Sequence, residues 1–221
     1  MMIPAGNVQV DLAEHGDMVV HRFKTDGEFE TEALQSWTSM LGEGDVAIDV
    51  GAYSGLYAIA GSKRGATVHA LEPLPSAFNR MLQNLTRNET GAKGKVVTYQ
   101  RAAGLDHGRK PFVLNGAMHM PSAGTLKQFA PEARTGVRKT IDVDVWRLDH
   151  IVHGPVKVIK IDAEGGELEV LKGSTIILGL HKPAIIVELL SEAAEAEVGD
   201  WLRGHGYVGQ PLDDRNWLFE N

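Results

Sequence analysis

The sequence predicts a single α/β domain, residues 1–221, built on a doubly wound, mostly parallel sheet of the Rossmann-like kind. The chain has 221 residues, which is the usual size of one domain. From residue 46 onward, short apolar runs typical of buried strands alternate with stretches of helical periodicity. Such alternation is typical of βαβ units, which place parallel strands in one sheet and helices on both of its faces.

Composition and charge exclude several classes of protein. The chain has no cysteine, which excludes disulfide scaffolds, thiolate zinc sites and thiol nucleophiles. Its 22 Lys and Arg against 29 Asp and Glu give a net charge of −7, the wrong sign for a chain that binds nucleic-acid phosphates. Neither a leader peptide nor an apolar run of membrane-spanning length is visible. We therefore expect a cytoplasmic protein without a membrane span, with a homodimer as the default oligomer.

The first 41 residues are expected to form a hairpin and a helix outside the alternating part. Residues 8–23 alternate imperfectly between apolar and polar side chains around Gly16 and Asp17, which favours a short hairpin. Residues 30–41 carry apolar side chains at helical spacing and end before Gly42, a typical helix stop.

The alternating part then predicts its elements in order. The first half consists of a strand at 46–50, a glycine turn at 51–55, a helix at 56–61, a strand at 67–71, a helix from Pro75 and a strand at 95–99. The second half consists of a strand at 156–161, a helix at 166–172, a strand at 184–187 that ends on Glu188, a helix at 193–203 and a hairpin around Asp213 and Asp214.

An insertion at residues 102–153 separates the two halves. It contains two expected strands, at 112–114 and 140–146. Between them, residues 115–139 include two prolines and three glycines and show little periodicity. This segment is too long for a plain connection, and two interpretations stay open: a flap that faces the substrate, or a surface loop.

Ligands of doubly wound sheets bind beyond the carboxyl ends of the strands. Beyond the first strand, Asp49 precedes a G-x-x-x-G turn from Gly51 to Gly55, which differs from the dinucleotide fingerprint G-x-G-x-x-G. A carboxylate at this turn would repel a pyrophosphate and attract an ammonium group. Glu72 ends the next strand, where nucleotide-binding folds place an acid for the ribose hydroxyls. An amino-acid end and a ribose together describe S-adenosylmethionine (SAM).

Four motifs resemble those of the FkbM family of SAM-dependent methyltransferases: VAIDVGAYSG at 46–55, ALEP at 70–73, IKIDAEGGE at 159–167 and AIIVE at 184–188. The resemblance extends from about residue 29 to 189. It implies a class I methyltransferase fold and methyl transfer to a hydroxyl of a sugar, glycolipid or secondary metabolite. It also implies a methionine-binding loop at 49–55, in which Tyr53 replaces the commoner Asn, and a later glycine, Gly166, that replaces the commoner Ala.

With the same resemblance, Glu72 corresponds to the ribose-binding acid, and the residues after the third strand correspond to the adenine site. The expected cofactor-binding residues are Asp49, Gly51, Ala52, Tyr53, Ser54, Gly55, Glu72, Pro73, Ala102, Ala103 and Asp162.

Lys160, Asp162 and Glu188 are the candidate catalytic residues. Lys160 and Asp162 are two residues apart on an interior strand, hence on one side of the sheet, and a buried lysine requires a charged partner. If the strands that end at Asp162 and Glu188 are neighbours, both carboxylates meet near the reacting methyl group. Three interpretations stay open: a Mg²⁺ or Ca²⁺ site at Asp162 and Glu188, a metal-free group that orients and deprotonates the acceptor, or a buried ion network.

Four other polar residues have simpler expected roles. His107 and His119 are alternative bases, although solvent exposure is the favoured explanation of each. Glu164 and Glu167 are expected to cap the helix at 166–172.

The predicted function is that of a SAM-dependent O-methyltransferase that acts on a hydroxyl group of a small molecule, such as a sugar or a secondary metabolite. Two alternatives remain. A nicotinamide-dependent oxidoreductase fits the fold alone, although the G-x-x-x-G turn with Asp49 argues against it. A non-catalytic SAM-binding protein fits the cofactor residues.

Overall fold

The structure is a computed structural model that describes residues 1–115, 123–126 and 139–221. Most of the predicted flap, with His119, lies outside the described residues. The centre of the fold is a seven-stranded sheet with the order β12-β13-β11-β10-β3-β4-β5. Five of its strands are parallel: β3 (Val46–Val50), β4 (Thr67–Leu71), β5 (Lys95–Tyr99), β10 (Val158–Ile161) and β11 (Ala184–Glu188).

The closing hairpin of the chain completes this sheet as predicted. Strand β13 (Asn216–Glu220) runs antiparallel beside β11, and β12 (Val208–Pro211) runs antiparallel beside β13. Strand β10 in the middle is buried at every position. A central strand with both faces covered needs a continuous apolar run, which explains why the second half of the chain could be assigned from its short apolar segments.

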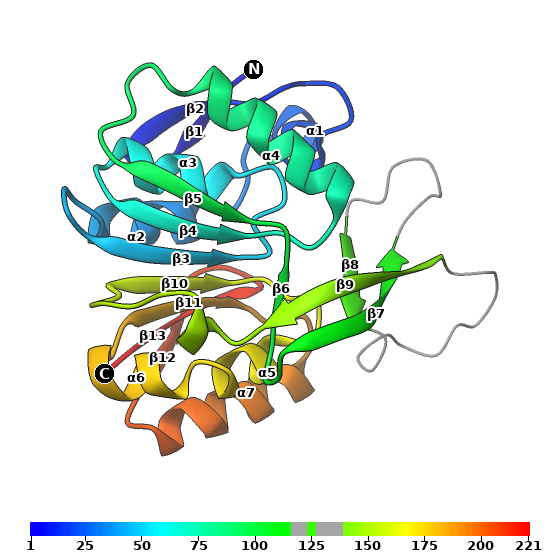
Figure 1. Ribbon diagram of the computed structural model, residues 1–221. Coiled ribbons are helices and arrows are strands. Elements are labelled where there is room, and N and C mark those ends of the chain that lie inside the picture. Colours follow the sequence, from blue (N-terminus) through cyan, green and yellow to red (C-terminus); the bar gives the residue numbers. More distant parts are fainter. Residues whose placement is uncertain (116–122, 127–138) are drawn as a thin grey trace.

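Helices cover both faces of the sheet (Figure 1). One layer contains α2 (Thr31–Met40), α3 (Leu56–Lys63) and α4 (Pro75–Arg87), and the other contains α5 (Glu167–Lys172), α6 (Thr175–His181) and α7 (Glu192–Gly204). The first layer is held by Trp37, which is fully buried and donates its indole N–H to the Tyr57 carbonyl at 3.0 Å. Helix α6 was not expected from the sequence. Among the described residues, no helix has the length and apolarity needed to cross a membrane.

The N-terminal hairpin lies earlier in the chain than predicted. It consists of β1 (Met2–Ala5) and β2 (Val8–Asp11), so the prediction of a hairpin over residues 8–23 is wrong. Residues Met18–Asp26 form helix α1 instead. The Asp17 carboxylate accepts hydrogen bonds from the backbone N–H groups of Val19 and Val20 at 2.9 and 3.2 Å, so the Gly-Asp pair starts a helix rather than a hairpin turn.

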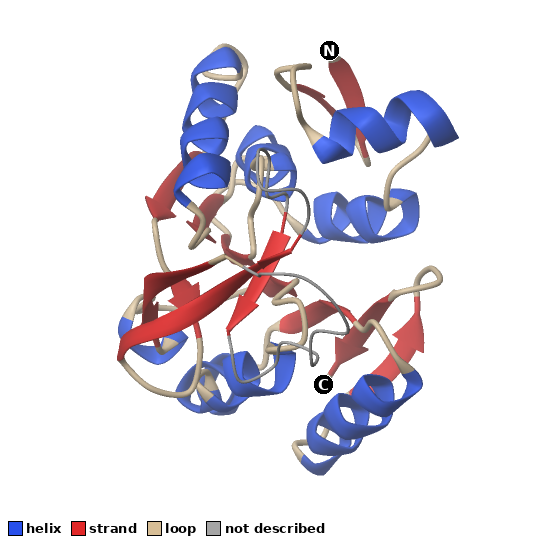
Figure 2. Cartoon of the chain, turned by 90° about the vertical axis from the view of Figure 1, so that its right-hand side faces the viewer, coloured by secondary structure: helices blue, strands red, loops and turns tan. Residues whose placement is uncertain are grey.

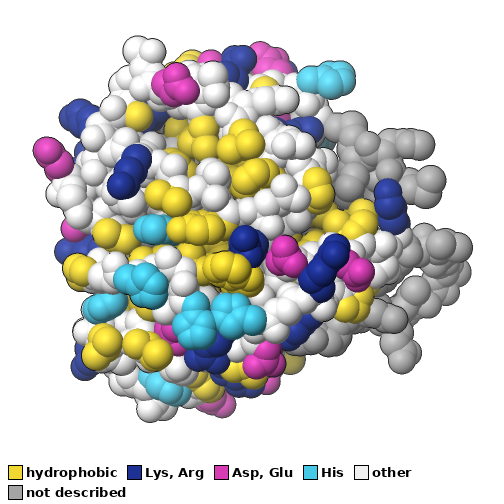
Figure 3. All heavy atoms as spheres, viewed as in Figure 1, with side chains coloured by type: hydrophobic (Ala, Val, Ile, Leu, Met, Phe, Trp, Pro, Cys, Tyr) yellow, Lys and Arg dark blue, Asp and Glu magenta, His cyan; other side chains and the backbone are white. Residues whose placement is uncertain are grey.

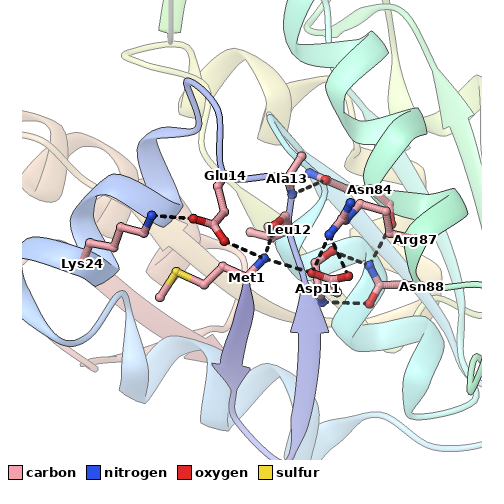
Figure 4. A network of polar contacts seen from close by, with 9 residues as sticks. All are labelled: Met1, Asp11, Leu12, Ala13, Glu14, Lys24, Asn84, Arg87 and Asn88. Atoms are coloured by element: carbon pink, nitrogen blue, oxygen red, sulfur yellow. Dashed lines mark hydrogen bonds and ion pairs between the residues drawn. The ribbon is translucent and has the colours of Figure 1, made fainter.

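Two buried asparagines, one in α4 and one at its end, fix the N-terminal segment to the domain (Figure 4). Asn88 accepts from the backbone N–H of Asp11 and donates to its carbonyl, at 2.9 and 2.8 Å. Asn84 accepts from the backbone N–H of Ala13 at 2.8 Å and donates to the carbonyl of Ser54 at 2.8 Å. Asn84 therefore ties the N-terminal segment to the glycine turn at 51–55.

Replacement of Asn84 by alanine is expected to lower the free energy of unfolding by about 2 kcal/mol, because it leaves a buried N–H and a buried carbonyl without partners. Gln83→Ala, at an exposed position of the same helix, is the matched control. Urea denaturation of both variants measures the difference. Equal stability of the two variants would contradict the role given to Asn84.

A second sheet forms from the insertion. Its four strands have the order β6-β9-β7-β8: β6 (Ala102–Ala103), β7 (Gly108–Asn115), β8 (Ala123–Leu126) and β9 (Thr140–Trp146). The predicted strands at 112–114 and 140–146 are confirmed, whereas β6 and β8 were not predicted. Figure 2 looks toward the carboxyl ends of the parallel strands, with this smaller sheet on the viewer's side. The insertion is thus placed beside the edge where ligands bind in such folds.

Candidate functional site

A cavity of about 850 Å³ opens at the carboxyl ends of β3, β4, β10 and β11. All but one of the residues expected to bind the cofactor or to act in catalysis line it; the exception is Gly55, which is buried. The selected residues in its wall are Asp49, Gly51, Ala52, Tyr53, Ser54, Glu72, Pro73, Ala102, Ala103, Lys160, Asp162 and Glu188.

The glycines of the turn are required by the fold itself. Gly51 has a φ of 77°, and a Cβ atom there would lie 1.9 Å from the carbonyl oxygen of Asp162. The end of the neighbouring strand therefore occupies the space beside Gly51. Gly55 has a φ of 88° and precedes α3, with Met81 packed against it. Both positions favour glycine because L side chains rarely adopt such angles.

Glu72 is held rigidly at the end of β4. Its two carboxylate oxygens accept the backbone N–H groups of Tyr53 at 2.9 Å and of Leu74 at 2.7 Å. Burial raises the pKa of Glu72 to about 7. Tyr53 has a φ of 46°, an angle at which asparagine is more common than tyrosine, and its hydroxyl accepts the N–H of Met18 at 3.0 Å. This bond joins the turn to the start of α1.

Lys160 lies at the centre of the site. It is 2% exposed, it is opposite Asp49 in the register of β10 and β3, and its Nζ has no hydrogen-bond partner among the residues that the structure describes. Burial lowers the pKa of Lys160, but the surrounding carboxylates, with Glu30 first, raise it above its ordinary value. Nearby, Oδ2 of Asp49 is likewise buried without a partner in the described part of the chain. The site therefore holds charges that lack partners.

Asp162 and Glu188 meet at the cavity, as the predicted neighbourhood of their strands requires. Burial, followed by the negative charge of Asp162, raises the pKa of Glu188 to about 8. Arg215 of the closing hairpin places Nη1 3.7 Å from Oε1 of Glu188. Across residues 1–115, 123–126 and 139–221, no three His, Asp or Glu side chains converge as a metal site would require, so the Mg²⁺ hypothesis gains no support.

Of the other polar candidates, Glu164 and Glu167 differ from expectation, whereas His107 is exposed as expected. Glu167 accepts the backbone N–H groups of Ala163 and Gly165 at 3.1 and 2.9 Å, so it fixes the loop before α5. Glu164 lines the cavity, and burial raises its pKa to about 7, so capping of α5 does not describe its position. His107 stacks on His150 and is not among the residues that line the cavity. Figure 3 shows that several histidines are exposed on one face of the protein.

Two walls of the cavity were not predicted from the sequence. One consists of α1 and the link to α2, and the other is the turn of the closing hairpin. Residues 18–32 contain no recognisable motif. Glu30, at the start of α2, could not be distinguished in the sequence from an acid that only stabilises a helix N-terminus. The residues in these walls include Met18, Val19, Arg22, Phe29, Glu30, Leu212, Asp213, Arg215 and Asn216.

The stability of the protein without ligand is expected to fall as the pH rises. Burial raises the pKa of Asp49, Glu72 and Glu164 to about 7 and that of Glu188 to about 8, whereas in the unfolded chain these groups ionise near pH ~4. Between these pKa values the folded protein binds more protons than the unfolded chain. The stability that these carboxyl groups contribute is therefore fully present below about pH 4 and decreases as the pH rises to about pH 8. His69, whose pKa is lowered by burial, acts oppositely only below about pH 6.5.

The corresponding measurement is the thermal midpoint between pH 6.5 and 8.5, which should decrease. The decrease should be smaller in Glu72→Gln, which removes one of the titrating groups. A midpoint that is constant or rises over this interval would contradict the arrangement of buried carboxyl groups.

Comparison with known proteins shows which family the sequence matches. The family model described as the methyltransferase FkbM domain matches residues 49–208. A hexuronic acid methyltransferase, AglP of Haloferax volcanii, is 33% identical over 167 residues, an alignment that covers 68% of this chain and 63% of the relative. The chain thus spans less than two thirds of that relative's length.

Solved structures share the fold. The FkbM methyltransferase of Methylobacillus flagellatus aligns with a TM-score of 0.58 at 16% identity, over 95% of this chain and 56% of that one. A precorrin-6y C5,15-methyltransferase of Geobacter metallireducens aligns with a TM-score of 0.54 at 16% identity, over 98% and 97%. A Streptococcus mutans protein in complex with S-adenosylhomocysteine (SAH) aligns with a TM-score of 0.51 at 11% identity, over 87% and 98%.

Proposed function

This chain belongs to the FkbM family of methyltransferases, and we propose that it uses SAM to methylate a hydroxyl group of a sugar-type acceptor. The observation that carries this proposal is the excess of buried carboxylates around one unpartnered ammonium, in a cavity at the carboxyl edge of the sheet. SAM brings two cationic groups, the sulfonium and the α-ammonium, to a site in which several buried carboxylates surround a single buried ammonium. The chemistry of the wall therefore fits the cofactor that the family uses.

Different residues at the carboxyl edge of the sheet would bind different parts of the cofactor. Glu72 keeps free lone pairs beyond its two backbone bonds and would accept the ribose hydroxyls. Ala102 and Ala103 line the cavity with small apolar side chains, against which the adenine would pack. Asp49, with its unpartnered oxygen, would accept the α-ammonium group. The SAH in the Streptococcus mutans structure supports such an occupant for this fold.

Asp162 and Glu188 would handle the acceptor. SAM supplies a methyl group that the positive sulfur makes electrophilic, so the protein's task is to align the acceptor oxygen with it and to take one proton. The pair lies beyond the proposed ribose and ammonium sites, toward β13. Glu188, with its raised pKa, would receive the proton while Asp162 orients the hydroxyl and Lys160 holds the charge of the pair. This division of roles uses no metal.

A sugar acceptor is supported by the relative named for a hexuronic acid. Three arginines of the cavity wall, Arg22, Arg101 and Arg215, are available to a sugar carboxylate. The test is transfer of labelled methyl from SAM to glucuronosides and matched glucosides, followed by mild alkali, which releases methyl esters but not ethers. Alkali-stable label on sugar supports O-methylation of a hydroxyl. Alkali-labile label, or no transfer to either sugar, contradicts the proposal.

The proposed base makes a pH-dependent prediction. Because Glu188 must be ionised to accept a proton, kcat is expected to rise with pH and to level off above about pH 8. In Glu188→Gln the rate should be about 100-fold lower and should lose this rise. An unchanged pH profile in the variant would remove Glu188 from the proton transfer.

A further inference from the structure

Glu30 is a wall residue of the cavity that lies outside residues 49–208, the part matched by the family model. It precedes α2, in the link from α1, and its backbone has a φ of 43° and a ψ of 46°. Its side chain forms no cap with the helix that follows. The Glu30 carboxylate therefore does not cap the N-terminus of α2, as an acid at the start of a helix commonly does.

The contacts of Glu30 hold one of its oxygens and leave the other available. Oε2 accepts the hydroxyl of Tyr57 at 2.7 Å. Tyr57 is buried in α3, where its ring contacts Trp37 edge-on with centroids 5.7 Å apart. In the described part of the chain, no ion pair within 4.0 Å includes Glu30 or Lys160. The buried Tyr57 therefore positions the Glu30 carboxylate, and no cation of the described residues lies close enough to form an ion pair with it.

The surrounding charges indicate what would bind there. Glu30, Asp162, Glu188 and Asp49 all act on Lys160, so four carboxylates share a single buried ammonium. Burial raises the pKa of Glu30 although Lys160 and the Tyr57 hydroxyl lower it, so the protein alone compensates the charge of Glu30 only in part. A ligand with an ammonium group would supply the missing positive charge. An ammonium group carries three N–H donors, and the one unpartnered oxygen of Asp49 can accept only part of them.

We propose that Glu30, held by the Tyr57 hydroxyl, binds the α-ammonium group of the amino-acid end of the cofactor together with Asp49. This inference rests on the proposed function, because it assigns the amino-acid end of SAM to this wall of the cavity. It makes the N-terminal segment a part of the binding site: the link between α1 and α2 supplies a recognition group that the strand ends do not.

The test compares two ligands that differ only by the amino-acid end. SAH contains the α-ammonium and carboxylate, and 5′-methylthioadenosine lacks both. Calorimetric titration of Glu30→Gln is expected to show SAH affinity about 10- to 100-fold below that of the wild type, with methylthioadenosine affinity within about twofold. The amide oxygen of the substituted side chain can still accept the Tyr57 hydroxyl, so the variant should keep the fold. Glu43→Gln, at an exposed acid shortly after α2 and outside the cavity wall, is the matched loss of charge and should change neither affinity.

Each outcome separates the inference from the proposed function. If the wild type binds neither ligand, the proposed function fails first. If the wild type binds SAH and Glu30→Gln binds it equally well, the inference alone is overturned. An equal loss for both ligands would also overturn it, because it would show a change in the whole cavity. Tyr57→Phe, which frees Glu30 but retains its charge, is expected to reduce SAH affinity less than Glu30→Gln does.

Discussion

Replacement of Asp49 by asparagine is expected to weaken SAM binding by about 100-fold. The carboxylate is 2% exposed, and its Oδ2 is without a partner in the described structure, so a ligand ammonium would gain a charge-assisted hydrogen bond in a dry site. Such bonds contribute about 1.5–3 kcal/mol, which corresponds to roughly 10- to 150-fold in affinity. Asparagine keeps the shape of the side chain and removes its charge.

The same substitution should leave the fold intact. Burial raises the pKa of Asp49 to about 7, so at pH 8 its charge destabilises the empty protein, and the variant's thermal midpoint should not be lower there. Asp26→Asn, at an exposed acid on the rim of the same cavity, is the control and should bind SAM like the wild type. Wild-type affinity in Asp49→Asn would remove Asp49 from the cofactor site.

Asp162→Asn is expected to lower kcat by about 100- to 1,000-fold while the affinity for SAM changes by no more than a few fold. A group that orients the acceptor and shares its proton contributes roughly 10²–10⁴ in rate. The adjacent Glu188, whose pKa Asp162 helps to raise, should become a weaker base once that charge is lost.

Asp214→Asn, at an exposed acid in the opposite wall of the cavity, controls for charge alone. Single-turnover rates and SAM titration of both variants separate chemistry from binding. Loss of the folded state in Asp162→Asn, or a rate equal to that of the wild type, would favour the ion network that merely holds the strand ends.

The central sheet could be predicted because its inner strands are mostly buried. Residues 184–187 are a continuous apolar run and residues 46–50 are apolar except for Asp49, and burial of such runs requires helices on either side. The N-terminal segment could not be placed in the same way. The alternation over residues 8–23 is weak, and the capping bonds of Asp17 depend on local geometry that a Gly-Asp pair shares with hairpin turns. Helix α6 has only seven residues, too few for a clear period.

The candidate site shows a similar division. Asp49, Glu72, Asp162 and Glu188 could be selected because each lies at or just beyond a strand end, and parallel strands bring those ends together. Glu30 lies in the same cavity because of the path that the chain takes between α1 and α2. The periodicity of the sequence does not predict that path. The requirement for glycine at 51 could not be derived from the sequence, because it comes from the carbonyl of Asp162, which occupies the space beside it.

The central claim is that this cavity binds SAM. Its most direct test is calorimetric titration of the purified protein with SAH and, separately, with NAD. We predict saturable binding of SAH at one site per chain, about 100-fold weaker in Asp49→Asn, and no binding of NAD. Saturable binding of NAD with no heat from SAH would contradict the claim and would favour the oxidoreductase alternative.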